Sequence, residues 1–356
     1  MKSVVLGASG YSGAELLRIL ATHGEIDLVA AGATSHAGQR ISSIYPSLYP
    51  FSGEVEFIGS DRLIEDIVAG DLEVDVVFLA LPHGVSQRIV PRLYKKVGLI
   101  VDLAADFRLR DESLYPKWYG SVHSAPDYLS KAVYGLPEIN RDQLKGAKLI
   151  ASAGCYVTCS TLPLHPLVAG DLIEKGSIII DAASGVTGAG RSLRDNLLFS
   201  EVDEDFSVYG MKNHRHTPEI EQNLGCQVQF TPHLLPTNRG ILATTYSAPS
   251  EKFSGVVGAA SDPEAAGSEL LISSLREAYA DEPFVFVTPD PPSIKATLGS
   301  NNAMVWATYD HRTRRIITIS ALDNLVKGAA GQAIQCANIA LGLIEQEGLL
   351  SFGLYP

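Results

Sequence analysis

The segment Ser3-Val-Val-Leu-Gly7-Ala-Ser-Gly10-Tyr-Ser-Gly13-Ala-Glu-Leu-Leu-Arg-Ile-Leu20 decides the fold of the first half of this chain. A short apolar run leads into a glycine-rich turn, and apolar residues at helical spacing follow. A strand, a glycine turn and a helix in this order are the context of a dinucleotide-binding loop, because a helix start offers backbone N–H groups to a pyrophosphate. The glycines are spaced at i, i+3 and i+6 rather than as GxGxxG, so a tight turn without a ligand is the alternative.

The end of the second predicted strand, residues 26–31, indicates which dinucleotide is bound. A site that prefers NAD places Asp or Glu there, on the ribose 2′-hydroxyl. This chain instead has Thr34, Ser35 and Arg40 in that region. Hydroxyls and a guanidinium suit a 2′-phosphate, so we expect NADP. A solvated loop is the competing explanation for these three residues.

Two further apolar runs, residues 74–81 and 99–103, are continuous rather than alternating. Such runs are typical of strands buried on both faces of a parallel sheet. Ligands of doubly wound α/β folds bind beyond the carboxyl ends of these strands. His83, Asp106 and Arg108 follow the two runs and are therefore candidate site residues, with ordinary loop and helix-cap roles as the alternative.

The stretch Leu149-Ile-Ala-Ser-Ala-Gly-Cys155-Tyr-Val-Thr-Cys-Ser160 presents a cysteine directly after a glycine, where a helix can begin. Free N–H groups and the positive end of the helix dipole favour a thiolate at such a position. Cys155 is therefore a candidate nucleophile, and a small buried cysteine is the alternative. Cys159 lies one helical turn later and is expected to pack in the core.

A second cluster of candidate site residues lies in the segment Asn213-His-Arg-His-Thr-Pro-Glu-Ile220. We expect Thr217 to cap a helix that begins at Pro218. His214 and His216 precede that helix, and either can act as a general acid or base. A metal-binding pair and hydrogen-bonded structural histidines are the alternatives.

The second half of the chain has the pattern of an α+β domain with a mixed or antiparallel sheet. Residues 177–181, 241–248, 304–309 and 315–321 are predicted strands, and residues 263–279 a surface helix. The loop 182–191 is rich in glycine and could approach a ligand. We expect residues 250–265 to be the loosest segment. Small residues at 328–331 would let a helix pack closely against the cofactor or the first domain.

Bulk properties exclude several classes of protein. The 356 residues suggest two domains, and the net charge of −12 argues against nucleic acid or an anionic membrane as the main partner. The four cysteines form no CxxC pair and no zinc-like spacing, so we expect no metal and a reducing compartment. We see no signal peptide and no apolar run of transmembrane length, and we therefore expect a cytoplasmic protein.

Several segments, taken together and in order, resemble one family. They are residues 7–16, 78–84, 102–108, 134–138, 154–156, 184–191, 214–220 and 323–332. The chain resembles the N-acetyl-γ-glutamyl-phosphate reductases of arginine biosynthesis, in the semialdehyde dehydrogenase superfamily. It departs from the family pattern at Ala153, where Pro is usual, and at Ala104, where Ser is usual. Both replacements are small.

The resemblance implies a Rossmann-type NADP-binding domain at residues 1–149, completed by a C-terminal helix at 326–356. It implies an α+β catalytic and dimerisation domain of the semialdehyde dehydrogenase type at residues 150–325. The implied activity is NADPH-dependent reduction of N-acetyl-γ-glutamyl phosphate to the 5-semialdehyde and phosphate, through a cysteine thioester. The alternatives are a reductase for aspartyl phosphate or a carrier-bound aminoadipyl phosphate, and a regulator that has lost catalysis. The family implies a homo-oligomer, dimer or tetramer.

The resemblance also implies a role for each candidate residue. Cys155 is the nucleophile, and His216 is the general acid/base, oriented by Glu219; His214 is the open alternative. The expected cofactor-binding residues are Gly7, Ser9, Gly10, Tyr11, Ser12, Gly13, Thr34, Ser35, Arg40, Leu81, Pro82, His83, Ser184, Gly185 and Asn324. The expected substrate-binding residues are Arg108, His214, Arg215 and Arg239, with no assignment of one arginine to one anion.

Overall fold

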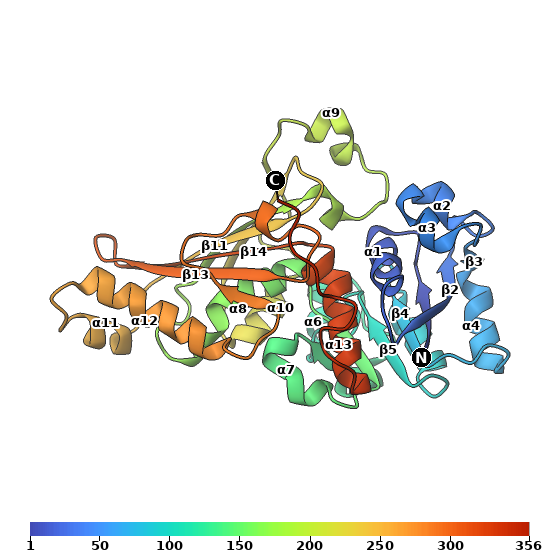
Figure 1. Ribbon diagram of the computed structural model, residues 1–356. Coiled ribbons are helices and arrows are strands. Elements are labelled where there is room, and N and C mark those ends of the chain that lie inside the picture. Colours follow the sequence, from blue (N-terminus) through green and yellow to red (C-terminus); the bar gives the residue numbers. More distant parts are fainter. Residues whose placement is uncertain (356) are drawn as a thin grey trace. The chain divides into compact units, whose positions relative to one another are not determined.

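The computed structural model describes residues 1–355, which fold into two compact units (Figure 1). Unit 1 consists of Met1–Gly154 and Ala329–Leu350. Unit 2 consists of Cys155–Gly328 and the described residues from Ser351 onward. The chain thus passes from one unit to the other directly before Cys155 and again directly after Gly328.

Unit 1 is built on a seven-stranded sheet of order β3-β2-β1-β4-β5-β7-β6, in which every neighbouring pair is parallel. Its strands β4, β5 and β7 are entirely buried, as continuous apolar runs predict. The order places a topological switch between β1 and β4, where doubly wound folds bind ligands. The strands are β1 (Lys2–Leu6), β2 (Asp27–Ala33), β3 (Ile58–Gly59), β4 (Val76–Leu79), β5 (Leu99–Asp102), β6 (Val133–Gly135) and β7 (Leu149–Ser152).

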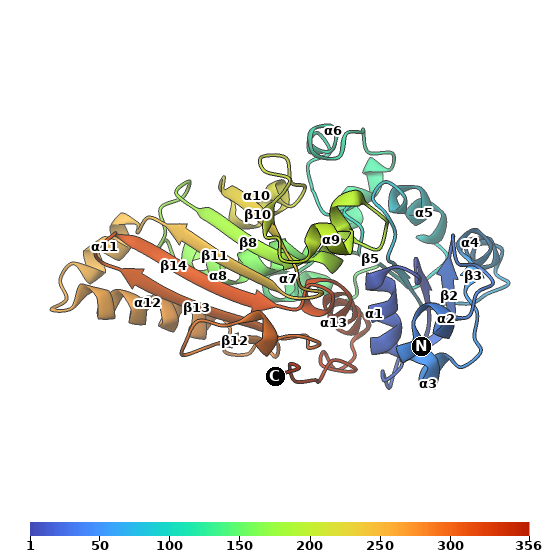
Figure 2. The same ribbon diagram turned by 90° about the horizontal axis from the view of Figure 1, so that it is seen from above.

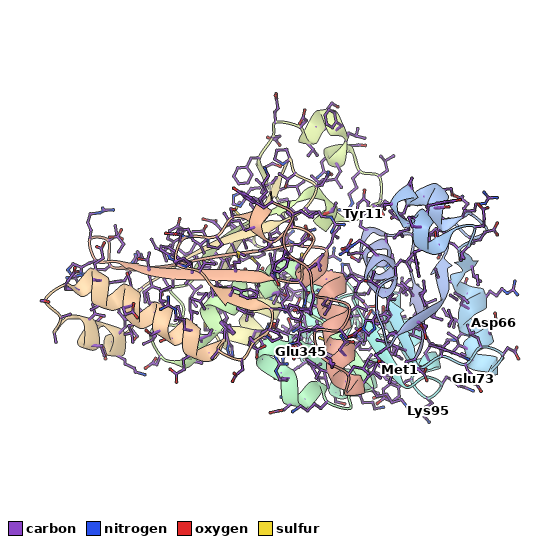
Figure 3. All side chains as sticks on the ribbon, in the orientation of Figure 1. Met1, Tyr11, Asp66, Glu73, Lys95 and Glu345 are labelled. Carbon is purple, nitrogen blue, oxygen red and sulfur yellow. The ribbon has the colours of Figure 1, made fainter. Side chains whose placement is uncertain are left out.

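Helices cover both faces of this sheet, which confirms the predicted doubly wound fold. One face packs on α4 and α5, and on the other face α13 contacts both α1 and α7 (Figure 2). Figure 3 labels Tyr11 at the start of α1 and Glu345 just beyond α13. The helices are α1 (Tyr11–Leu20), α2 (Ile41–Ile44), η1 (Pro46–Leu48), α3 (Tyr49–Ser52), α4 (Ser60–Ala69), α5 (Ser86–Leu93), α6 (Leu114–Tyr119), η2 (Pro126–Lys131), α7 (Pro137–Leu144) and α13 (Gly331–Leu341).

Unit 2 is built on a mixed seven-stranded sheet of order β12-β13-β14-β11-β8-β10-β9, as the alternating patterns predict. The β8–β10 and β12–β13 pairs are parallel and the others are antiparallel. Burial alternates along β13, so one face is core and the other is partly exposed. The strands are β8 (Ile179–Gly185), β9 (Ser207–Val208), β10 (Gln229–Leu235), β11 (Ile241–Ser247), β12 (Val285–Val287), β13 (Ala303–Asp310) and β14 (Arg315–Leu322).

The helices α8, α10 and α12 lie along one face of this sheet (Figure 1). Helix α8 is apolar on all sides and almost wholly buried, as expected of a central core helix. Cys159 lies in this core as predicted, and burial raises the pKa of its thiol to about 12. The helices are α8 (Cys155–Ala169), η3 (Val186–Ala189), η4 (Asp195–Leu197), α9 (Phe199–Val202), α10 (Thr217–Leu224), α11 (Glu251–Val257), α12 (Pro263–Ala278), η5 (Ile294–Ala296) and the π-helical turn η6 (Val326–Ala330).

The prediction that residues 250–265 are loosely structured is wrong. Helix α11 begins directly after Ser250, whose side chain accepts the backbone N–H of Phe253 at 3.0 Å. Phe253 and Val257, one turn apart, are buried and anchor the helix. A cap and two apolar anchors are enough to order a seven-residue helix whose other positions show little periodicity.

Within residues 1–355, no helix combines the length and the apolar character needed to cross a membrane.

A buried carboxyl group lies at the carboxyl end of β5. Oδ1 of Asp102 accepts the hydroxyl of Ser86 at 2.7 Å and the backbone N–H of Ala104 at 3.1 Å. Burial, with a smaller contribution from the charge of Asp106, raises the pKa of Asp102 to about 8. The native state therefore keeps a proton on Asp102 at pH values where the unfolded chain has lost it.

We expect the raised pKa of Asp102 to make the free energy of unfolding fall as the pH rises. The native state binds the extra proton between the ordinary pKa of 3.8 and about 8, so the contribution of Asp102 falls by up to about 1.4 kcal/mol per pH unit across that window. Asp102→Asn should flatten the dependence, measured as urea unfolding from about pH 5 to about pH 8. The exposed Asp111→Asn is the control, and a wild-type slope in Asp102→Asn contradicts the prediction.

Candidate active site

Cys155 is the first residue of α8, the kind of position that the sequence predicted for it. Its side chain is partly exposed and packs against the hydrophobic core of unit 2. The helix runs for 15 residues behind it, so its first N–H groups and its dipole act on the sulfur. Both effects favour the thiolate, which is the nucleophilic form of cysteine.

The π-helical turn η6 presses against the backbone of this cysteine. A Cβ atom added to Gly328 would lie 2.7 Å from Cβ of Cys155 and 3.3 Å from its Cα. The N–H of Gly328 donates to the carbonyl of Asp323 at 2.9 Å, which holds the turn in place. Only glycine permits this approach. The sequence had predicted that small residues here serve contact with the cofactor or the first domain; Gly328 instead meets the candidate nucleophile.

His214 lies in an aromatic environment. Its ring centroid is 5.6 Å from Tyr156, 5.5 Å from Tyr209 and 5.3 Å from Phe230. Its Nδ1 accepts the backbone N–H of His216 at 3.2 Å, so that nitrogen carries no proton. Burial, assisted by the positive charge of Arg215, lowers the pKa of His214 to about 4. His214 is therefore neutral near pH 7.

His216 is the N-cap residue of α10, and its carbonyl accepts the N–H of Ile220 at 2.9 Å. The predicted start of this helix at Pro218 was one residue late, because Thr217 is already helical. The ring of His216 is 4.8 Å from that of His214 and 6.0 Å from that of Tyr156. Glu219 is the third residue of α10 and is fully buried. Of the two histidines, His216 is the one placed at a helix start.

Two tyrosines that the sequence analysis missed complete this group. The hydroxyl of Tyr156 donates to the carbonyl of His233 in β10 at 2.7 Å, and the hydroxyl of Tyr209 donates to the oxygen of Tyr156 at 3.2 Å. Burial raises the pKa of both phenols, so both stay protonated. We call Tyr156, Tyr209, His214, His216 and Phe230 the aromatic–histidine cluster. Tyr156 is the residue directly after Cys155, which is the one sequence signal that could have pointed to it.

A buried carboxylate organises the loop that follows β14. Asp323 accepts the N–H groups of Leu325 at 2.8 Å, Val326 at 3.2 Å and Gly299 at 2.7 Å. The guanidinium of Arg239, a predicted substrate ligand, lies 3.4 Å from the same carboxylate. Arg239 is partly exposed, and this ion pair holds its guanidinium beside Asp323.

The predicted cofactor ligands of unit 2 lie together near this loop and are tied to one another. Asn324 accepts the N–H of Gly240 at 2.8 Å and donates to the hydroxyl of Thr187 at 2.9 Å. Ser184 is buried and donates to the carbonyl of Gly185 at 3.0 Å. A Cβ atom on Gly185 would lie 2.8 Å from the backbone nitrogen of Arg239. The close packing of these two loops is therefore sufficient to explain why residue 185 is a glycine.

In unit 1, the glycine-rich turn between β1 and α1 is closely packed. Gly7 has φ of +84°, and a Cβ there would lie 2.2 Å from the carbonyl oxygen of Ala80. A Cβ on Gly13 would lie 2.3 Å from the carbonyl oxygen of Gly7. Ser9 and Gly10 lead into α1, which begins with Tyr11 and Ser12. A tight turn at the start of a ten-residue helix fits a pyrophosphate.

The residues predicted to read the 2′-phosphate follow β2. Thr34 and Ser35 are exposed, and the hydroxyl of Ser35 lies 3.0 Å from Nδ1 of His36. Arg40 is mostly exposed and forms an ion pair with Glu54 at 2.7 Å. An exposed ion pair is weak, so a phosphate could replace the carboxylate as the partner of Arg40.

The remaining candidates of unit 1 follow β4 and β5. Leu81 and Pro82 follow β4 after Ala80, and Nδ1 of His83 accepts the N–H of Ala105 at 3.3 Å. Asp106 accepts the N–H groups of Gly84 at 2.7 Å and Gln87 at 3.1 Å, so its carboxylate caps the start of α5. Arg108 is buried and donates to the carbonyl of Leu103 at 2.7 Å. In unit 2, Arg215 is exposed.

Comparisons with known proteins agree with this architecture. A family model described as semialdehyde dehydrogenase, NAD binding domain, matches residues 2–147, and one described as semialdehyde dehydrogenase, dimerisation domain, matches residues 155–324. A protein of Symbiobacterium thermophilum is 44% identical over 99% of this chain and 98% of its own length. One of Acidothermus cellulolyticus is 47% identical over 99% and 98%. Both are named N-acetyl-gamma-glutamyl-phosphate reductase.

Solved structures share the fold at lower identity. Aspartate semialdehyde dehydrogenase II of Vibrio cholerae, complexed with ASA, matches with a TM-score of 0.68 at 16% identity, over 95% of this chain and 97% of that one. The aspartate semialdehyde dehydrogenase of Candida albicans, solved with NADP, matches with a TM-score of 0.67 at 17% identity over the same shares. These likenesses establish the fold of the chain.

Gly328→Ala tests whether the contact between η6 and Cys155 matters. The added methyl group must displace the cysteine backbone, so we expect a loss of about 1–3 kcal/mol in unfolding free energy. We also expect slower alkylation of Cys155 by iodoacetamide at neutral pH, measured on the Cys155 peptide by mass spectrometry. Gly255→Ala is the matched control, because that helical glycine has open space around its Cβ position. Identical behaviour of the two variants would show that the contact is unimportant.

Proposed function

This chain belongs to the N-acetyl-gamma-glutamyl-phosphate reductase family, and from that membership we propose that it reduces N-acetyl-γ-glutamyl phosphate to N-acetylglutamate 5-semialdehyde and phosphate in arginine biosynthesis. The observation that carries this proposal is a nucleophile-like cysteine at a helix start, in a chain that matches reductases of this name along nearly its full length. Unit 1 is the dinucleotide-binding domain and unit 2 the catalytic and dimerisation domain in this proposal.

NADPH is the cofactor that we assign to unit 1, where the turn from Gly7 to Gly13 fits a pyrophosphate. Thr34, Ser35 and Arg40 would take the 2′-phosphate. Leu81, Pro82 and His83 follow the neighbouring strand β4, and Ser184, Gly185 and Asn324 are the candidate ligands from unit 2. Bound NADPH supplies the hydride that reduces the acyl group.

Cys155 carries the acyl group in the proposed mechanism. Its thiolate attacks the carbonyl carbon of the acyl phosphate, the carbon–oxygen bond to phosphate breaks, and a thioester remains. Backbone N–H groups at the start of α8 stabilise the tetrahedral oxyanion. After reduction, the carbon–sulfur bond breaks, which releases the aldehyde and restores the thiolate.

His216 is the general acid/base in this proposal, and Glu219 orients it. His214 is neutral down to about pH 4 and accepts the backbone N–H of His216, so it lacks the proton that a general acid needs near pH 7. His216 donates a proton to the oxygen that departs with phosphate. Arg108, Arg215 and Arg239 are the candidates for the carboxylate and the phosphate of the substrate, since a guanidinium binds both with two parallel hydrogen bonds.

We also propose that two copies of the chain associate through the partly exposed face of the unit 2 sheet. Trp306, Ile317 and Ile319 lie at partly exposed positions of β13 and β14. An apolar sheet face of this kind is typical of an interface between protein chains. The four free cysteines suit the reducing cytoplasm, where we propose that the enzyme works.

A reverse assay tests the proposed reaction: aldehyde, phosphate and NADP⁺ are mixed, and NADPH formation is followed. We expect turnover with N-acetylglutamate 5-semialdehyde and at least about a hundredfold lower kcat/KM with aspartate 4-semialdehyde or a carrier-bound aminoadipate semialdehyde. Cys155→Ser should abolish turnover and leave NADPH binding, measured by fluorescence, nearly unchanged. A preference for another aldehyde overturns the substrate, and turnover by Cys155→Ser overturns the mechanism.

Replacing each histidine separately tests which one transfers protons. We expect His216→Asn to lower kcat by about 10²–10⁴-fold, the range for loss of a general acid/base. His214→Asn should lower kcat by only about tenfold, because it disturbs the position of His216 without removing a proton donor. Steady-state kinetics near pH 7 measure both values, and the opposite order would assign the proton transfer to His214.

A further inference from the structure

Tyr156 occupies a central place in the aromatic–histidine cluster. Its ring meets those of both histidines edge-to-face, at 5.6 Å for His214 and 6.0 Å for His216, and meets Phe230 at 5.5 Å. It is also the neighbour of Cys155 along the backbone of α8, and it is almost fully buried. One side chain thus joins the helix that carries the nucleophile to the loop that carries the imidazoles.

The hydroxyl of Tyr156 fixes this ring to a third element. It donates to the carbonyl of His233 in β10 at 2.7 Å and accepts the hydroxyl of Tyr209 at 3.2 Å. Strand β10 pairs with β8 on one side and β9 on the other, so its carbonyl is a rigid point of attachment. A phenylalanine would keep the ring contacts and lose the attachment.

We propose that Tyr156 is a positioning residue that sets the place of both imidazoles relative to Cys155 through the bond of its hydroxyl to β10. Only the expected change in kcat rests on the proposed function; the expected change in Cys155 alkylation does not. Tyr156 itself stays protonated and transfers nothing. It acts through the ring of His216, whose distance from the thiolate decides how strongly a protonated imidazole stabilises it, and through the neutral His214, which accepts the backbone N–H of His216.

The charged and titratable groups around the cluster include Glu219, which is buried in the first turn of α10. Arg215 lies in the histidine loop, and its charge acts on His214 and Tyr209. Cys155 lies at the start of α8, and its charge acts on Tyr156 and Tyr209. His233 contributes its carbonyl from β10. A less firmly held His216 would leave the Cys155 thiolate with less stabilisation, so we expect the alkylation of Cys155 to move to higher pH.

The test compares Tyr156→Phe with Tyr279→Phe. Tyr279 is a matched control because it is buried in the same core and its hydroxyl also donates to a backbone carbonyl, that of Leu162 in the middle of α8. Both variants lose the hydrogen bond that a tyrosine hydroxyl donates to a backbone carbonyl. Only Tyr156→Phe should change the chemistry of Cys155, whereas a general loss of stability should affect both.

The readout is the rate of Cys155 alkylation by iodoacetamide as a function of pH, followed on the Cys155 peptide. We expect the midpoint for Tyr156→Phe to rise by about half a pH unit or more, with the Tyr279→Phe midpoint as in the wild type. Turnover should show about tenfold lower kcat with KM within about twofold, as for a misplaced catalytic group. An unchanged or lowered midpoint in Tyr156→Phe, or equal shifts in both variants, overturns the proposal.

A milder variant keeps the proposal testable if Tyr156→Phe does not fold. Tyr209→Phe removes only the bond donated to the oxygen of Tyr156, and it should raise the same midpoint by a smaller amount. An unchanged midpoint there overturns the proposal. Alkylation needs no substrate, so a shifted midpoint without reduction of N-acetyl-γ-glutamyl phosphate would reject the proposed function and leave the positioning role in place.

Discussion

The active site depends on one constraint: the backbone at Cys155 is held between the start of its own helix and a π-helical turn. Helix α8 is buried on nearly all sides, so its first residue cannot shift without disturbing the core. Gly328 closes the other side, with no room for a Cβ atom. A thiolate held in this way meets an incoming carbonyl in a fixed geometry, which is worth more to catalysis than the intrinsic reactivity of a free thiol.

Two histidines that lie close together in the sequence occupy different places in the fold. His214 is enclosed by aromatic rings and accepts a backbone N–H, so its pKa falls to about 4 and it stays neutral. His216 stands at the N-cap of α10, where its ring contacts those of Tyr156 and His214. In the proposed mechanism one imidazole supports the loop and the other transfers the proton. In our proposal Tyr156 and Tyr209 also have a structural role: they hold the neighbouring rings in place and keep their own protons.

Local sequence patterns predicted the elements, and long-range packing determined the rest. The turn from Gly7 to Gly13, the parallel sheet and the mixed sheet follow from periodicity and glycine placement. The contact of Gly328 with Cys155 joins positions 173 residues apart (328 minus 155), which no local pattern reveals. The proposed choice between His214 and His216 depends on the aromatic rings around His214 and on its hydrogen bond to the backbone of His216, which only the fold supplies. Helix α11 was missed because one cap and two buried side chains, rather than a regular apolar stripe, hold it in place.

The measurement that tests the central claim most directly is mass spectrometry of enzyme mixed with N-acetyl-γ-glutamyl phosphate in the absence of NADPH and quenched in acid. A thioester survives acid, so the proposed mechanism predicts an N-acetylglutamyl group on the peptide that contains Cys155, together with about one equivalent of released phosphate. Phosphate release or turnover without that adduct, or an adduct on any other residue, would contradict the account.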